Sequence, residues 1–207
     1  MRIKVCGMRN EDNIIGLCEL PIDFIGFIFY PKSARYVPKM PPVEIRSGIK
    51  RVGVFVNPTM SEIATRSNEF KLDYIQLHGN ESENFCKKLN QNGYKVIKAF
   101  SIDDKFDFRI MDGYESSCDF FLLDTKGKSY GGNGIAFNWG ILKKYESKKK
   151  FFLSGGIDLS NIERIKNLNI PLLVAIDVNS KFEIEPALKD LNKIKQLTDQ
   201  LFDKKTT

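Results

Sequence analysis

Two side chains stand out because a possible base and a possible acid occur where apolar runs end. Cys6 closes the run RIKVC and precedes Gly7, and Asp124 follows the run DFFLL. A cysteine thiolate can remove a proton from carbon, and a carboxylic acid can supply one. If the two run ends meet at one site, Cys6 and Asp124 form a candidate general base and general acid.

Both residues also have a simpler interpretation. A cysteine in a strand is often a small buried apolar side chain, and Asp124 is placed to cap the next loop or to pair with Lys126 or Lys128. In the catalytic interpretation, Lys4 favours the thiolate of Cys6, because alternating side chains put the two residues on one strand face. Partial burial is expected to keep Asp124 protonated.

Strands are expected to position these residues. Runs rich in Ile, Val, Phe and Leu recur at intervals of about 20 to 30 residues, and polar, helix-like segments separate them. Several runs are apolar at nearly every position, which is typical of parallel strands buried on both faces. The predicted strands are 2–6, 23–29, 51–56, 73–77, 95–100, 119–123, 151–154 and 172–176.

Eight alternations of strand and helix admit a closed barrel or an open doubly wound sheet. The closed barrel is favoured, because the units are evenly sized and no G-x-G-x-x-G follows the first run. The sequence predicts one α/β domain over residues 1–207, a single (β/α)8 TIM barrel, with the chain after about residue 203 frayed. Catalytic residues of such a barrel lie at the carboxyl ends of the strands.

Helix boundaries are predicted from capping signals. Gly93 is expected to end one helix, and Pro186 to open the last helix, whose apolar stripe runs from Leu188 to Leu201. The predicted capping boxes are Thr59 with Glu62, Ser160 with Glu163 and a weaker pair, Asn80 with Glu83.

Composition limits the class of protein. The four cysteines are scattered and His78 is the only histidine, so we expect no disulfide, no metal site and no cofactor. The net charge of +6 comes from lysines spread over many segments, which argues against nucleic acid and suits a small anionic substrate. No apolar run is long enough for a membrane span and no secretory signal is recognised, so a cytoplasmic monomer or homodimer is expected.

Other strand ends carry residues suited to anions. Gly155 and Gly156 follow the seventh run and Ser180 follows the eighth, and these are the two loops that hold phosphate in many barrels. Arg35 could clamp a second anion through its planar guanidinium group. The glycine-rich segment TKGKSYGGNG after Asp124 is suited to a loop that closes over substrate.

A series of short motifs resembles phosphoribosylanthranilate isomerase. The motifs occur in order over residues 3 to 190, and they are KVCGMR, GFIFYPKSARYV, VGVFVN, IQLHG, KAF, LLDT with GGNG, FNW, LSGGI and AIDVNS. The resemblance implies a β/α barrel that catalyses the Amadori rearrangement of phosphoribosylanthranilate in tryptophan biosynthesis, without cofactor or metal. The implied partner is a small phosphorylated anion.

The resemblance also implies roles for individual residues. Cys6 corresponds to the general base and Asp124 to the general acid, in agreement with the argument from the residues. Arg35 is implied to bind the anthranilate carboxylate. The other implied substrate-binding residues are His78 and Asp177, which line the pocket, Gly155, Gly156 and Ser180, which hold the phosphate, and Gly131, Gly132 and Gly134 of the glycine-rich loop.

Some positions depart from the family pattern. The loop usually written GGTG has asparagine at Asn133, and the motif FDW has asparagine at Asn138. After the eighth run the family generally has serine at Asn179, with glycine and valine at Lys181 and Phe182. Because a side chain restricts a backbone position where glycine is usual, no phosphate contact is assigned to Lys181.

Two rival functions remain open. The sugar-phosphate isomerase of histidine biosynthesis performs the same rearrangement on a related substrate, but it typically has a carboxylate where this chain has Cys6. A barrel that only binds anionic ligands or RNA through its basic surface leaves Cys6 and Asp124 without a role.

Overall fold

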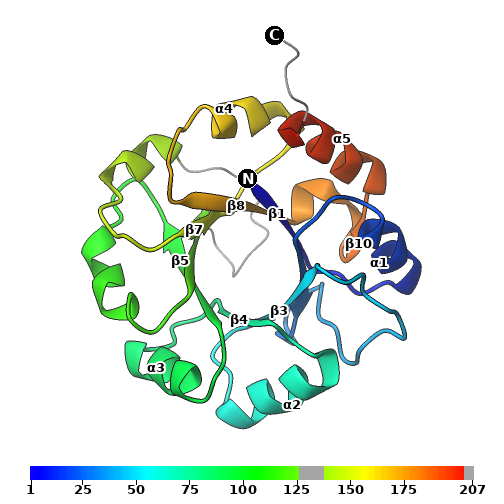
Figure 1. Ribbon diagram of the computed structural model, residues 1–207, viewed down its shortest axis with the longest axis horizontal. Coiled ribbons are helices and arrows are strands. Elements are labelled where there is room, and N and C mark those ends of the chain that lie inside the picture. Colours follow the sequence, from blue (N-terminus) through cyan, green and yellow to red (C-terminus); the bar gives the residue numbers. More distant parts are fainter. Residues whose placement is uncertain (126–137, 203–207) are drawn as a thin grey trace.

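Eight parallel strands close into a barrel (Figure 1). The computed structural model describes residues 1–125 and 138–202. Each strand pairs with the next, and the last pairs with the first. The strands are β1 (Arg2–Cys6), β2 (Phe24–Ile28), β3 (Lys50–Phe55), β4 (Tyr74–Leu77), β5 (Val96–Ile102), β6 (Phe120–Thr125), β7 (Phe151–Leu153) and β8 (Leu173–Val178). The predicted TIM barrel is confirmed, and each predicted strand overlaps an observed one.

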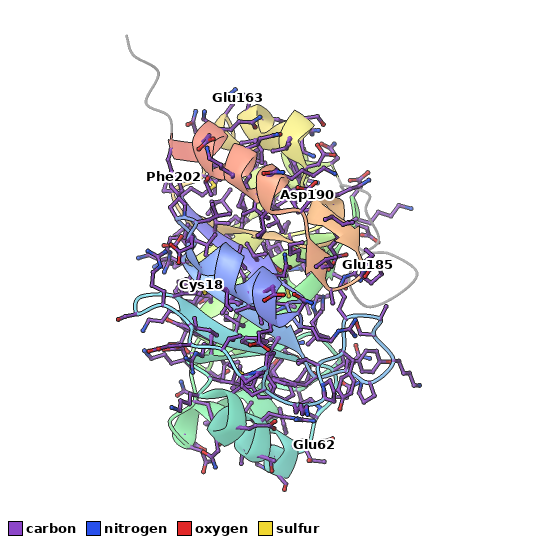
Figure 2. The ribbon with its side chains drawn as sticks, turned by 90° about the vertical axis from the view of Figure 1, so that its right-hand side faces the viewer. Cys18, Glu62, Glu163, Glu185, Asp190 and Phe202 are labelled. Atoms are coloured by element: carbon purple, nitrogen blue, oxygen red, sulfur yellow. The ribbon has the colours of Figure 1, made fainter. Side chains whose placement is uncertain are left out.

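Helices surround the barrel on its outer side (Figure 1). The α-helices are α1 (Glu11–Cys18), α2 (Met60–Phe70), α3 (Glu83–Gln91), α4 (Ile162–Lys166) and α5 (Leu191–Phe202). The short 3-10 helices are η1 (Phe108–Tyr114), η2 (Trp139–Lys144), η3 (Leu159–Asn161) and η4 (Ser180–Phe182). Helices α1 and α5 lie against each other (Figure 2), and Gly16 allows this, because a Cβ there would lie 2.5 Å from Leu191. None of the described helices is both long and apolar enough to cross a membrane.

The connection from β2 to β3 departs from the predicted alternation. Residues 29–49 contain no helix. Prolines at positions 31, 38, 41 and 42 explain the difference, because proline lacks a backbone N–H and restricts the residue before it. This irregular connection carries Arg35 toward the carboxyl ends of the strands.

Two apolar layers hold the barrel together. The outer layer lies between strands and helices, and the inner layer fills the barrel. The inner layer consists of Phe24, Val52, Ile97, Ala99, Leu122, Phe152 and Ala175. Because successive side chains alternate between the two faces of a strand, Asp124 and Asp177 continue inward-facing positions of β6 and β8 toward the carboxyl ends. The barrel interior is therefore apolar in its middle and polar at this end.

The predicted helix starts are correct in one case and wrong in two. The Thr59–Glu62 capping box is present at α2. Helix α3 is capped by Ser82 instead of Asn80. The predicted box at Ser160 is replaced by one between Asp158 and Asn161, which opens η3. In both cases the side chain that accepts the hydrogen bond from the free backbone N–H groups lies two residues away from the predicted one.

The predicted start of the last helix is also wrong. Pro186 lies in the turn between two short strands, β9 (Glu183–Glu185) and β10 (Leu188–Lys189), and Leu188 belongs to β10. Helix α5 begins at Leu191, where the Asp190 carboxylate accepts a hydrogen bond from a first-turn N–H. By contrast, Gly93 follows the end of α3 with φ +83°, as predicted for a C-terminal cap.

Candidate active site

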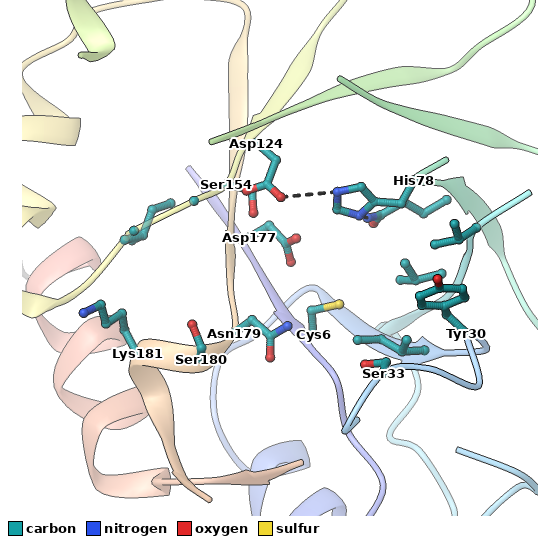
Figure 3. A pocket seen from close by; sticks show the side chains of 17 residues that line it. Cys6, Tyr30, Ser33, His78, Asp124, Ser154, Asp177, Asn179, Ser180 and Lys181 are labelled. Atoms are coloured by element: carbon teal, nitrogen blue, oxygen red, sulfur yellow. Dashed lines mark hydrogen bonds and ion pairs between the residues drawn. The ribbon is translucent and has the colours of Figure 1, made fainter. Parts of the chain in front are cut away.

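A pocket opens at the carboxyl ends of the strands (Figure 3). It brings together side chains from β1, β4, β6 and β8 and from the loops that follow them. The predicted site residues that line it are Cys6, His78, Asp124, Gly155, Gly156, Asp177 and Ser180. Polar residues that also line it are Tyr30, Ser33, Gln76, Ser154, Asn179 and Lys181. The candidate base and acid therefore face one space, although they are far apart in the sequence.

Cys6 ends β1 and is almost completely buried. Glycine at position 26 makes room for its thiol, because a Cβ there would lie 2.8 Å from the Cys6 Sγ. Burial raises the pKa of the Cys6 thiol above its ordinary value, and the opposing charges of Lys4 and Lys189 do not cancel this effect. The predicted influence of Lys4 on the thiol is present, but burial outweighs it.

Lys4 forms a buried ion pair on the inner face of the barrel. Its Nζ donates a hydrogen bond to Asp177 Oδ1 at 2.8 Å, and the Lys4 side chain is fully inaccessible to solvent. Burial disfavours the charged amine, but the charge of Asp177 and this hydrogen bond leave the pKa of Lys4 above its ordinary value. Burial also raises the pKa of Asp177. Because the pair combines one cation with one anion, it adds no net charge beneath Cys6.

Asp124 lies on β6, where it contacts His78 (Figure 3). Its Oδ1 accepts a hydrogen bond from the Thr125 N–H at 2.9 Å, and its Oδ2 lies 3.2 Å from His78 Nε2. The other ring nitrogen of His78, Nδ1, lies 3.3 Å from the Gln76 side-chain amide nitrogen. Gln76 is buried, and its Oε1 has no hydrogen-bond partner among the described residues. The alternative pairing of Asp124 with Lys126 or Lys128 involves positions outside the described residues.

A second buried ion pair supports the loop that carries His78. Lys98 Nζ donates to Glu81 Oε2 at 2.9 Å and to the Gly79 carbonyl at 2.8 Å. The Glu81 carboxylate in turn accepts hydrogen bonds from the backbone N–H groups of Asn57 and Gly79. The side chains of Lys98 and Glu81 are only 4% and 3% exposed. This network ties together the loops that follow β3 and β4.

The two loops predicted to hold phosphate both border the pocket. Gly155 and Gly156 have φ values of +84° and +66°, a region that favours glycine. A Cβ at Gly155 would also lie 2.2 Å from the Thr125 hydroxyl oxygen, so no larger residue fits there without a shift. Ser180 and Lys181 line the pocket from the loop after β8 (Figure 3). The lysine that replaces the usual glycine therefore lies at the predicted phosphate end.

Arg35 is not one of the residues that line the pocket. Its guanidinium group forms a bidentate ion pair with the Glu183 carboxylate, with Nε 2.9 Å from Oε1 and Nη2 2.6 Å from Oε2. The Arg35 side chain passes over Gly7, where a Cβ would lie 2.8 Å from Arg35 Cδ. Arg35 thus lies beside the end of β1, and its binding of an anthranilate carboxylate stays a prediction.

Three predicted site residues cannot be placed, and three residues at or beside the pocket were not predicted. Gly131, Gly132 and Gly134 lie outside the described residues. Sequence reasoning did not identify Gln76, although the alternation of strand faces places its side chain with that of His78. It also missed Glu183 and Lys189. Lys189 falls within the predicted last helix, and Glu183 lies in the preceding loop, where no local signal shows that it pairs with Arg35 and Lys189.

In the part of the chain that the structure describes, no three histidine, cysteine, aspartate or glutamate side chains gather closely enough to hold a metal ion. The four cysteines are free and buried.

Comparison with known proteins identifies the family. The family model for N-(5'phosphoribosyl)anthranilate (PRA) isomerase matches residues 3–200. The N-(5'-phosphoribosyl)anthranilate isomerase of Parabacteroides distasonis is 46% identical over 206 residues, which cover 97% of this chain and 93% of the relative. The crystal structure of phosphoribosyl anthranilate isomerase from Thermotoga maritima has a TM-score of 0.80 at 33% identity, over 96% of this chain and 97% of the other.

A further solved isomerase with this name contains reduced 1-(o-carboxyphenylamino)-1-deoxyribulose 5-phosphate. It has a TM-score of 0.76 at 30% identity and covers 96% of this chain and 97% of its own. The similarity extends over nearly the whole barrel. This chain therefore belongs to the phosphoribosylanthranilate isomerase family of tryptophan biosynthesis and is an isomerase built on a TIM barrel.

Proposed function

We propose that this chain converts N-(5'-phosphoribosyl)anthranilate to 1-(2-carboxyphenylamino)-1-deoxyribulose 5-phosphate, with Asp124 as general acid and Cys6 as general base. The observation that carries this proposal is that the two side chains, from β1 and β6, line one pocket. Both are buried, so water competes little with a bound sugar for their protons. The bound ligand of the solved relative supports the substrate class.

Asp124 acts first and donates its proton to the ribose ring oxygen. The ring C–O bond of the aminal then breaks, and the nitrogen lone pair forms a Schiff base. Before this step, a neutral His78 ring with a bare Nε2 can accept a hydrogen bond from the protonated Asp124 carboxyl group, since the two atoms lie 3.2 Å apart. In that tautomer Nδ1 carries the hydrogen, and Gln76 accepts it through its carbonyl oxygen after a half-turn of its amide.

Cys6 acts second. The Schiff base acidifies the adjacent C2′ proton, and the thiolate removes it to give an enolamine. The enolamine then tautomerises to the ketone. Because Asp124 must start protonated while Cys6 is deprotonated, activity is expected to peak between two pKa values, and a flat rate from about pH 5 to 9 would argue against this division of roles.

The remaining predicted residues anchor the substrate. Gly155, Gly156 and Ser180 are proposed to hold the phosphate, with backbone N–H groups as donors. Arg35 is proposed to bind the anthranilate carboxylate with the N–H groups that Glu183 leaves free. Gly131, Gly132 and Gly134, which lie outside the described residues, are proposed to contribute to substrate binding.

The direct test is turnover of freshly made phosphoribosylanthranilate, followed by loss of its anthranilate-type fluorescence. Replacing Cys6 by alanine or Asp124 by asparagine is expected to lower kcat by about 10²- to 10⁴-fold, because each removes a group that transfers a proton. Cys18→Ala is the matched control, since Cys18 is also buried but belongs to α1 and does not line the pocket. Normal turnover by both Cys6→Ala and Asp124→Asn would defeat the proposal.

The same assay separates the rival functions. The histidine-pathway isomerase would turn over its own two-phosphate substrate in preference, and a barrel that only binds anions would turn over neither. For the proposed function, the anthranilate substrate is expected to react and the histidine-pathway substrate to react far more slowly, because the pocket holds a thiol where that enzyme typically has a carboxylate.

A further inference from the structure

Three charged side chains meet beside the end of β1, and we refer to them as the Arg35–Glu183–Lys189 cluster. Lys189 Nζ donates to Glu183 Oε1 at 2.6 Å, and Arg35 Nη2 donates to Glu183 Oε2 at 2.6 Å. The Glu183 carboxylate also accepts the Ala187 N–H at 3.0 Å. The segments that supply the cluster are the β2–β3 connection, β9 and β10, which the barrel closure brings together.

The cluster holds two cations and one anion. The Lys189 side chain is fully inaccessible, and that of Glu183 is 5% exposed. Burial lowers the pKa of Lys189 to about 8, so this amine remains mostly charged at neutral pH. Burial works against the charge of Glu183 as well, but the hydrogen bonds from Arg35 and the charge of Lys189 leave its pKa below the ordinary value. One positive charge is therefore left over.

This surplus charge lies next to the base. Lys189 Nζ donates to Asn179 Oδ1 at 2.7 Å. That same oxygen lies 2.9 Å from the point where a Cβ on Gly7 would be, immediately after Cys6, and Arg35 Cδ lies on the same side of Gly7. The charge of Lys189 lowers the pKa of the Cys6 thiol, against the larger effect of burial.

The other charged groups near Cys6 do not provide such a surplus. Below the thiol, Lys4 is matched by Asp177. Asp124 and His78 contact each other at the pocket. Lys181 also lines the pocket, but it is exposed and lies at the predicted phosphate end. The Arg35–Glu183–Lys189 cluster is thus the buried source of surplus positive charge among the described groups around this strand end.

We propose that Lys189 is a positioning residue for the base: it holds Asn179 against the end of β1 and keeps an uncompensated positive charge beside Cys6, which stabilises the thiolate. This role rests on the proposed function of Cys6. Glu183 limits this stabilisation of the thiolate, because its single carboxylate offsets one of the two cations. Arg35 keeps Glu183 paired when Lys189 is removed, so the Lys189 side chain can be replaced without leaving a buried carboxylate unpartnered.

The test is the pH titration of Cys6 in the folded protein, followed by the ultraviolet absorbance of the thiolate with Cys6→Ser as the blank. Lys189→Met is expected to raise the ionisation pH of Cys6 by about one unit, and Lys189→Arg to leave it nearly unchanged. Glu183→Gln removes the anion that offsets one of the cations, and it is expected to lower the ionisation pH of Cys6. A role in folding alone would not move the two titrations in opposite directions.

Kinetics provide the second readout. In Lys189→Met, kcat/KM is expected to fall about tenfold at neutral pH and to recover at higher pH, where Cys6 ionises without help. An unmoved Cys6 titration in folded Lys189→Met would overturn the proposal. If Lys189→Met does not fold, the titration of Cys6 in Glu183→Gln is the test. An unchanged or raised ionisation pH of Cys6 in that variant would overturn the proposal. Failure of the proposed function can be told apart from failure of the proposal for Lys189. If Cys6 is not the base, Cys6→Ser would retain full turnover, whatever the titrations show.

Discussion

The two sides of the pocket differ in where their buried cations lie. On the side of the proposed base, Lys4 extends into the barrel beneath Cys6, and Lys189 lies beside the same strand end. On the acid side, the buried cation is Lys98, which occupies an outward position of β5 because its neighbours belong to the inner apolar layer. Its amine is held by Glu81 and by loop carbonyls.

This difference matches the opposite needs of the proposed base, Cys6, and the proposed acid, Asp124. A thiolate is stabilised by nearby positive charge, whereas a carboxylic acid keeps its proton more readily where cations are absent. Within the described residues, Asp124 is contacted by a backbone N–H and by His78, which is neutral in the proposed tautomer. The barrel thus places one cation toward the thiol and another away from the acid, although both belong to buried ion pairs.

The largest expected effect comes from breaking the two buried pairs. Lys4→Met and Lys98→Met each leave a buried carboxylate without its cation, and each is expected to lower the free energy of unfolding by about 3–5 kcal/mol. Chemical denaturation measures this loss. Only Lys4→Met is expected to shift the titration of Cys6, since Lys98 lies outside the barrel interior.

A double variant provides the control for the outer pair. Lys98→Met combined with Glu81→Gln is expected to recover part of the lost stability, because the unpaired buried charge is removed. If Lys98→Met shifted the Cys6 titration as much as Lys4→Met, the distinction between the two sides would be wrong.

A smaller effect is expected from the acid side of the pocket. His78→Asn removes the ring that contacts Asp124, and kcat is expected to fall about 10- to 100-fold, the range for loss of one hydrogen bond to an ionisable group. Turnover of the wild type and of His78→Asn is measured over the same range of pH. The Cys6 titration should stay where it is, and a shift there would show that His78 acts on the base instead.

The smallest effect is expected from a change outside the pocket, at the start of α2. Thr59→Ala removes the capping box of α2 and is expected to lower the free energy of unfolding by about 1 kcal/mol without changing kcat. Hydrogen bonds from Thr59 lower the pKa of Glu62. Their stabilisation is therefore complete above the ordinary glutamate pKa and is lost as the pH falls through the lowered one.

Denaturation at several pH values checks this last prediction. The stability difference between wild type and Thr59→Ala should narrow in acid. A difference that is constant with pH would mean that the ionised Glu62 is not part of the cap.

The local pattern of the sequence was sufficient for much of the fold. All eight strands were predicted, because buried parallel strands are short apolar runs that can be read without knowing their partners. Helix starts were less predictable. Ser82 and Asp158 cap helices where Asn80 and Ser160 were expected, since several nearby side chains can satisfy the same free N–H groups and only the backbone conformation selects one.

Local patterns were enough to place Cys6 and Asp124 at the carboxyl ends of apolar runs and glycines after the seventh strand, because the position of a residue along a strand is a local property. The pairing of the buried charges depends on the folded barrel. Lys4 finds Asp177, and Lys189 shares Glu183 with Arg35, only because the barrel closes and a hairpin forms before α5. Ion pairs act over a few ångströms between residues that the chain separates widely, so no local pattern contains them.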